Sequence, residues 1–215
     1  EPVYRVTEGD RVVAEFPGSR LVTDCPVYHP PAEEDPAMAE LRARDVHAIA
    51  ERPDERDPLW TWTELLSSPT IASKAWVYRQ FDVSVGTNTL AGPGGDAAVV
   101  RLRGTDRALA LKTDCNGRYV YLEPRTGGKA AVAEAARNVA CTGARPMAIT
   151  NCLNFGNPKR PEVFFQFREA VGGMGDACTA LGTPVTGGNV SFYNESPTGA
   201  IDPTPTIGMV GLLSR

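Results

Sequence analysis

The sequence has very little histidine, and its cysteines form no recognisable pattern. The only histidines are His29 and His47, both in the first quarter of the 215 residues. A Ser-His or Cys-His nucleophile and a histidine-rich metal site are therefore excluded from the rest of the chain. The five cysteines are odd in number and never spaced as C-x-x-C. This argues against a zinc site or a disulfide scaffold and predicts a reducing, cytoplasmic location.

Long hydrophobic runs and excess positive charge are also missing. No apolar stretch approaches the roughly 18 residues of a membrane span, and no signal peptide pattern is present. The net charge is −4, from 22 Lys and Arg against 26 Asp and Glu. We therefore expect neither nucleic acid nor a membrane as a partner. The first residue is Glu1 rather than Met, and we expect the chain to be a piece of a longer protein.

What is present divides into three parts. Residues 1–28 contain two strand-like runs, Val3–Val6 and Arg11–Phe16, which we interpret as the trailing strands of a preceding subdomain. Residues 29–81 are rich in proline and acidic side chains, which predicts a linker with short helices. Residues 82–215 alternate strand-like runs with two long helical patterns, which indicates an α+β domain.

The linker carries helix-start signals and a group of aromatic residues. Asp35-Pro36 can serve as N-cap and first helical residue. Thr61-x-x-Glu64 has the form of a capping box. We expect the aromatic group to pack the linker onto the domain; its members are Trp60, Trp62, Trp76 and Tyr78. A base-stacking platform is the alternative, disfavoured because few Lys and Arg accompany these rings.

Within the domain, the two helices are expected at Gly127–Gly143 and Glu162–Leu181. Glycines at 172, 173 and 175 predict that another backbone packs closely against the second helix. A predicted core stripe on that helix consists of Phe164, Phe167, Val171, Met174, Cys178 and Leu181. The predicted strands are Ala97–Arg103, Arg107–Thr113, Arg145–Thr150 and Thr206–Leu213, the last with no helix to cover it.

A glycine-rich stretch, Val185–Glu195, is the main candidate for a functional loop. Gly187 and Gly188 would let the backbone turn sharply and form a nest of N–H groups for phosphate oxygens. Asn189 supplies a neutral oxygen for a hard cation such as Mg²⁺, and Ser191 supplies a hydroxyl group. The pattern predicts a phosphate and metal loop, with an ordinary loop after an edge strand as the alternative.

Six stretches carry a resemblance to a known family. They are Trp76–Asp82, Gly95–Val99, Lys112–Tyr119, Gly127–Asn138, Cys152–Pro158 and Gly187–Glu195. Together they resemble phosphoribosylformylglycinamidine (FGAM) synthase of purine biosynthesis, over essentially the whole chain. The resemblance implies an internal fragment that comprises the end of one subdomain, a linker, and the first subdomain of a second, pseudo-repeated half.

The resemblance also implies a fold for residues 82–215. The fold would be like the N-terminal domain of aminoimidazole ribonucleotide (AIR) synthase, with a mostly antiparallel sheet and helices packed on one face. The sheet would pair with a homologous partner to form a barrel.

By the same resemblance, specific residues would bind ligands. Asn151 and Gly188 correspond to ATP contacts, Asn189 to a Mg²⁺ ligand, and Ser191 to a contact with the ribonucleotide substrate. Asn151 departs from the family pattern, in which Asp is usual, so a charge-assisted contact would be lost. Asn116 stands where the family's catalytic histidine would be. Because an amide cannot act as a general base, no catalytic residue is expected in this chain.

A second group of residues could form an auxiliary nucleotide and magnesium site, as the resemblance implies. Carboxylates with a lysine suit Mg²⁺ and phosphate. The group consists of Asp96, Lys112, Asp114, Glu134 and Asn138. The alternative is a set of solvated surface carboxylates and a pair on one helix face.

The implied reaction converts formylglycinamide ribonucleotide to its amidine, using ATP, Mg²⁺ and ammonia drawn from glutamine. Its partners would be the rest of the FGAM synthase chain, a glutaminase subunit or domain, and a small accessory subunit. The isolated chain would be inactive and would form a homodimer through its unpaired sheet. Two alternatives remain open: a structural pseudo-repeat that binds no ligand, and a stand-alone AIR synthase or small-molecule kinase.

Overall fold

The computed structural model describes residues 2–50 and 57–214, which form two compact units divided between Pro30 and Pro31. The first unit is a two-stranded antiparallel hairpin. Its strands are β1 (Val3–Glu8) and β2 (Arg11–Pro17), followed by a short 3-10 turn at Gly18–Leu21. The two predicted strands are confirmed, and the Tyr4 and Phe16 rings stack across them at 5.3 Å.

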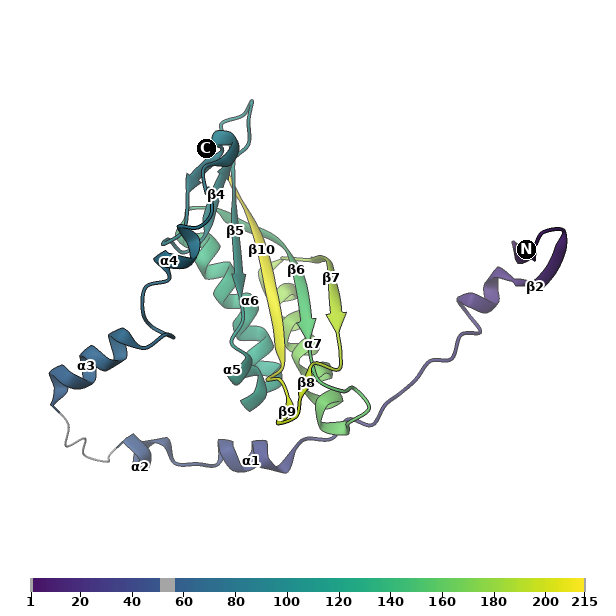
Figure 1. The fold of residues 1–215 in the computed structure, drawn as a ribbon, viewed down its shortest axis with the longest axis horizontal. Coiled ribbons are helices and arrows are strands. Elements are labelled where there is room, and N and C mark those ends of the chain that lie inside the picture. The colour runs from purple at the N-terminus through teal and green to yellow at the C-terminus, as the bar shows by residue number, and fades with distance from the viewer. Residues whose placement is uncertain (1, 51–56, 215) are drawn as a thin grey trace. The chain divides into compact units, whose positions relative to one another are not determined.

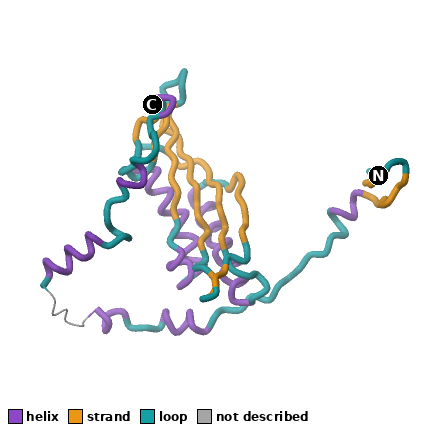
Figure 2. Tube along the Cα trace, in the orientation of Figure 1, coloured by secondary structure: helices purple, strands orange, loops and turns teal. Residues whose placement is uncertain are grey.

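The second unit is built on a six-stranded sheet of order β3-β4-β5-β10-β6-β7, among the residues that are described (Figures 1 and 2). Every neighbouring pair is antiparallel except β6 and β7, which run parallel. The strands are β3 (Thr89–Ala91), β4 (Ala98–Arg101), β5 (Ala108–Asp114), β6 (Arg145–Asn154), β7 (Val185–Ser191) and β10 (Thr204–Leu213). In the sequence, a small hairpin of β8 (Glu195–Ser196) and β9 (Gly199–Ala200) lies between β7 and β10.

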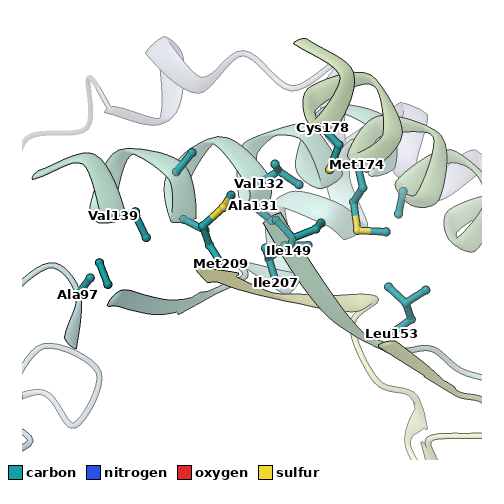
Figure 3. Packing of buried hydrophobic residues seen from close by; sticks show 14 of the residues in the cluster. Ala97, Ala131, Val132, Val139, Ile149, Leu153, Met174, Cys178, Ile207 and Met209 are labelled. Carbon is teal, nitrogen blue, oxygen red and sulfur yellow. The ribbon is translucent and has the colours of Figure 1, made fainter. Parts of the chain in front are cut away.

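Three helices pack on one face of this sheet (Figure 1). They are α5 (Gly117–Leu122), α6 (Pro124–Cys141) and α7 (Pro161–Leu181). Ile149, Ile207 and Met209 point from the strands toward Val132 and Met174 on the helices and are at most 2% exposed (Figure 3). The predicted α+β fold, mostly antiparallel with helices on one face, is therefore confirmed.

The last strand is covered by a helix, contrary to expectation. A Cβ atom at Gly211 of β10 would lie 2.3 Å from a Val139 side-chain carbon of α6, so helix and strand are in direct contact. The sequence pattern missed this contact because the covering helix precedes β10 by more than 60 residues.

Helices α6 and α7 approach each other through glycines. A Cβ at Gly128 would lie 2.4 Å from the Ala170 carbonyl oxygen, and one at Gly173 would lie 2.0 Å from the Arg125 carbonyl oxygen. The predicted close backbone approach is confirmed at Gly173, whereas a Cβ at Gly175 would meet nothing within 4 Å.

The predicted core stripe on α7 is partly wrong. Val171 and Leu181 are 38% and 46% exposed, whereas Met174 and Cys178 are buried as expected. The buried face of α7 is set by close contact with α6 and consists of Val163, Gln166, Ala170, Gly173, Met174 and Cys178. Phe167 also packs against the core as expected. The predicted stripe of large residues did not include Ala170 and Gly173, whose small size allows the close approach of the helices.

The predicted linker contains four described helices. They are α1 (Pro36–Arg42), α2 (Val46–Ala50), α3 (Pro58–Ser67) and α4 (Ala75–Tyr78). Asp35 caps α1 as predicted, since its carboxylate accepts the Ala37 N–H. Met38 of α1 is fully buried, and Arg42 donates to the Leu122 carbonyl of α5 at 2.9 Å. Helix α1 is therefore docked on the domain.

Two expectations for the linker are wrong. Helix α3 begins at Pro58 because Asp57 caps it, accepting the Leu59 N–H at 3.1 Å. Thr61 is a mid-helix residue whose N–H already bonds the Asp57 carbonyl, so it caps nothing. The packing expected of the aromatic group is not found for Trp62 and Trp76, which are 61% and 72% exposed, whereas Tyr78 is half-buried.

Candidate functional site

The glycine-rich stretch is a strand rather than a loop. Gly187 and Gly188 lie within β7, and neither has a positive φ angle. An anion-binding nest needs a left-handed residue, so the nest expected here is not formed. Pairing with β6 holds the segment extended: Thr150 lies opposite Gly187 in the parallel register, and its hydroxyl donates to the Gly187 carbonyl at 3.0 Å.

Asn151 also lies inside a strand, because β6 continues four residues past the predicted end at Thr150. Its neighbours across the sheet are Gly188 on one side and Ile207 on the other. Ile207 in turn lies opposite Asp114 of β5. Since neighbouring strands are about 4.8 Å apart, Asn151 and Asp114 lie roughly 10 Å apart in one row.

This row belongs to the helix-covered face of the sheet. Ile149 and Leu153, two residues either side of Asn151, are buried on that face, and strand side chains alternate. A Cβ at Gly188 would lie 2.1 Å from the Asn151 Oδ1 atom. The two predicted ATP residues are therefore in contact, and glycine is required at 188 because the Asn151 amide occupies the space.

Asn189 and Ser191 face the other side of the sheet. They lie opposite Cys152 and Asn154 in the parallel register, so the strand pleat turns them away from Gly188. This is the face opposite the one that carries α5, α6 and α7 (Figure 1). Asn189 is exposed and Ser191 is half-buried. The structure thus brings together Asn189 and Ser191 in one group, and Asn151 and Gly188 in another.

The turn after β7 is locked onto the loop after β6. The Tyr193 and Asn194 N–H groups donate to the Gly156 and Phe155 carbonyls, at 3.0 and 3.1 Å. Phe192 packs edge-on against Phe167 of α7, with ring centroids 5.1 Å apart. Tyr193 has a φ of +62°, a left-handed conformation that is uncommon outside glycine. Two stretches that carried the family resemblance therefore form one interlocked unit.

Four of the five auxiliary-site residues gather where β5 meets α6. Asn138 donates to Asp114 Oδ2 at 2.9 Å, and the Lys112 ammonium lies 3.6 Å from Asp114 Oδ1. The Asp114 side chain is only 11% exposed, so these two partners hold a carboxylate that is largely removed from solvent. The alternative of a fully solvated carboxylate does not describe Asp114.

The charge of Glu134 acts on the thiol of Cys115. Burial, together with the negative charges of Glu134 and Asp114, raises the pKa of the Cys115 thiol to about 11. Asp96, the fifth residue, shares with Lys112 the lining of a cleft of about 380 Å³. Among residues 2–50 and 57–214, no group of three or more His, Cys, Asp or Glu side chains could hold a metal ion.

Asn116 has a structural role that the sequence reasoning missed. Its side-chain oxygen accepts the Arg118 and Tyr119 N–H groups, at 3.2 and 3.4 Å, and so caps α5. Asparagine is among the best N-cap residues, so the signal was present in the sequence. The side chain at the position of the family's catalytic histidine is thus hydrogen-bonded to the N-terminus of a helix.

A family model identifies the fold. The model described as AIR synthase related protein, N-terminal domain, matches residues 94–213, more than half of the chain. The chain belongs to this family. The match covers Asp96 and every other predicted site residue, including Asn151 and Ser191.

Members of the family with known names give more detail. The chain is 57% identical over 211 residues to phosphoribosylformylglycinamidine synthase subunit PurL of Moorella thermoacetica, covering 98% of this chain but 28% of that protein. The resemblance to FGAM synthase is thereby confirmed, and the chain spans less than a third of its relative.

Solved structures of Thermotoga maritima PurL are similar to the chain. Those complexed with ATP and with FGAR each have a TM-score of 0.68 and 28% identity, and cover 99% of the chain and 32% and 31% of theirs. A structure of PurLQS from the same organism matches with the same TM-score and identity, over 100% of this chain and 32% of that one.

In the described residues, no helix is long and apolar enough to cross a membrane.

Proposed function

We propose that the chain is part of an FGAM synthase and contributes ATP, Mg²⁺ and ribonucleotide contacts to it. The whole enzyme is a carbon–nitrogen ligase that converts formylglycinamide ribonucleotide to the amidine, with ATP and glutamine-derived ammonia. The observation that carries the proposal is the 57% identity to PurL over nearly the entire chain. The ATP and FGAR complexes of the Thermotoga protein support the ligand classes.

Asn151 and Gly188 are assigned to ATP, and Asn189 to Mg²⁺. The exposed Asn189 supplies an amide oxygen, which is a ligand type that Mg²⁺ accepts. Mg²⁺ usually takes only one or two protein ligands beside phosphates and water, so a site on one amide is consistent with the lack of a metal-ligand cluster in the described residues. The exposed edge of β7 leaves backbone groups for a nucleotide.

Ser191 is assigned to the ribonucleotide, and the auxiliary group to a second nucleotide and Mg²⁺. In that group, the Lys112 ammonium and the Asp114 carboxylate supply the two charges that phosphate and Mg²⁺ need. Asp96, Glu134 and Asn138 complete it.

The reaction itself is assigned to another part of the enzyme. Asn116 can act neither as a base nor as an acid, and its oxygen already caps α5. The two histidines, His29 and His47, both lie outside the domain-family match. The isolated chain is therefore proposed to be inactive, without synthase or glutaminase activity.

We further propose that the enzyme works in the cytoplasm with a glutaminase and a small accessory subunit. The PurLQS assembly of the Thermotoga protein supports such partners. Within the full chain, the open sheet face would pair with a homologous sheet to close a barrel. A purely structural role in that barrel is the second candidate, favoured by the exposed Leu111 on that face.

The test compares variants of the full-length parent enzyme. Asn189→Ala is expected to raise the Mg²⁺ concentration needed for amidine formation, and Asn189→Asp to restore it, because a hard oxygen returns. Ala200→Gly, on the small hairpin, is the control and should leave the Mg²⁺ requirement unchanged. A wild-type parent without FGAM synthase activity would overturn the proposal, whereas equal Mg²⁺ curves for all variants would remove only the assignment of Asn189.

A further inference from the structure

The side chain of Asn194 lies at the centre of the turn that carries Ser191. Its amide nitrogen donates to the Ser191 carbonyl at 2.8 Å and to the Phe155 carbonyl at 3.0 Å. The Ser191 hydroxyl lies 3.3 Å from Asn194 Oδ1 and 3.2 Å from Nδ2. One half-buried amide thus joins the end of β7, the loop after β6 and the predicted substrate-binding hydroxyl.

The two carbonyl groups fix which way this amide points. A carbonyl oxygen can only accept, so the atom that faces both Phe155 and Ser191 must be the NH₂ group. Its two hydrogens are directed to those nearer acceptors. The remaining atom, Oδ1, can only accept, and the Ser191 hydroxyl is its available donor at 3.3 Å.

We propose that Asn194 is a positioning residue that takes the Ser191 hydroxyl hydrogen and leaves the serine lone pairs for the substrate. Ser191 then accepts a hydrogen bond from a substrate hydroxyl or amide N–H and does not donate to a phosphate. This inference rests on the proposed function, because it concerns the ribonucleotide assigned to Ser191.

The same turn provides a matched control. Glu195 also ties this turn to the loop after β6, since its Oε1 accepts the Asn157 N–H at 3.0 Å. That contact involves neither Ser191 nor Asn194. Removing it therefore loosens the turn without changing the donor and acceptor arrangement at Ser191.

The experiment uses the full-length parent enzyme and four variants: Ser191→Ala, Asn194→Ala, the double variant and Glu195→Ala. Each single change at Ser191 or Asn194 is expected to raise KM for the ribonucleotide about two- to tenfold, the range of one neutral hydrogen bond, with little change in kcat. Because Asn194 acts through Ser191, the double variant should be no worse than Ser191→Ala alone. Glu195→Ala should leave KM unchanged.

Additive losses in the double variant, or an equal KM rise in Glu195→Ala, would overturn the inference in favour of simple loop stability. The riboside that lacks the 5′-phosphate, used as a competitive inhibitor, tests the direction of the bond. The Ser191→Ala loss should persist with this riboside, and its disappearance would show that Ser191 contacts the phosphate. A wild-type parent without synthase activity would instead refute the proposed function. Thermal unfolding of each variant confirms that it is folded.

Discussion

The absence of a side chain at Gly188 of β7 leaves room for Asn151 of β6. The space that a Cβ would need is taken by Asn151, whose Oδ1 and carbonyl oxygen would lie 2.1 and 2.5 Å away. The neighbouring Gly187 has open space at the same position. Two adjacent glycines of one strand therefore differ in what they tolerate.

We predict that Gly188→Ala displaces the Asn151 side chain and destabilises the domain by about 1–3 kcal/mol, as overpacked sites do. In the parent enzyme it should also weaken ATP binding. Gly187→Ala should be neutral or stabilising, by up to about 1 kcal/mol, because glycine is unfavourable in a strand. Thermal unfolding and ATP titration measure both effects. Equal behaviour of the two variants would contradict the close contact with Asn151.

Cys115 is the residue whose titration reports on the auxiliary group. Burial, Glu134 and Asp114 raise its pKa to about 11 from the ordinary value of 9.0. The Cys115 thiol therefore loses its proton at a lower pH in the unfolded chain than in the folded chain. Cys115 therefore contributes stability that is present below about pH 9 and is lost as the pH rises toward 11.

We predict that alkylation of Cys115 has its pH midpoint near 11, well above the ordinary thiol value of 9.0. Glu134→Gln should lower the Cys115 midpoint, because it removes a negative charge that disfavours the thiolate. Mass spectrometry of alkylated peptides across pH measures each thiol separately. If the Cys115 midpoint lies at the ordinary value of 9.0, Cys115 is not held in the buried, acidic surroundings described here.

Among the elements, the pair α6 and α7 depends on backbone contact. The Arg125 carbonyl of α6 fills the space beside Gly173, and the Arg125 guanidinium pairs with Asp176 at 2.8 Å. Hydrogen bonding and charge from Asp176 raise the pKa of Arg125, while Lys129 and Arg125 lower the pKa of Asp176. These ion pairs are exposed, so the packing at Gly173 is expected to dominate.

We predict that Gly173→Ala costs about 1–3 kcal/mol of stability, because a Cβ 2.0 Å from a carbonyl oxygen forces the helices apart. Gly175→Ala, two residues along the same helix, should gain about 0.5–1 kcal/mol from the better helix propensity of alanine. Denaturant unfolding of both variants gives the comparison. The close approach of α6 and α7 would be refuted by a stable Gly173→Ala variant.

Local signals predicted the element types well but not their partners. The Asp35 cap and the helix end at Gly143, with φ of +85°, follow from short-range chemistry. The extended conformation at Gly188 does not, because it depends on pairing with Asn151, 37 residues earlier. The orientation of the Asn194 amide likewise depends on a distant contact, the Phe155 carbonyl 39 residues earlier. The residue types suggested the ligand assignments that we propose, whereas only the fold shows that the candidate residues lie on two faces of the sheet.

At the scale of the whole molecule, the sheet face opposite α5, α6 and α7 carries exposed apolar side chains. Leu111 on this face is 44% exposed. It borders a depression of about 410 Å³ that is also lined by Thr150, Gly208 and Val210. An apolar face of this kind favours association with a matching sheet.

We predict that the isolated chain forms a two-fold dimer through this face, because a second copy can approximate the missing homologous sheet. Leu111→Asp should make it monomeric. Leu181→Asp, which alters a similarly exposed leucine at the end of α7, should leave the dimer intact. Sedimentation equilibrium over a wide concentration range measures the mass. A monomeric wild-type chain at high micromolar concentration would show that the open face does not self-associate.

The position of β10 determines the order in which the domain can be completed during synthesis. This strand lies between β5 and β6 and bonds to both, yet the ribosome makes it after every other strand of the sheet. Until residues 204–213 emerge, the sheet consists of two separate parts, β3-β4-β5 and β6-β7. The nascent chain must therefore keep two exposed strand edges apart from each other and from neighbouring chains until its central strand arrives.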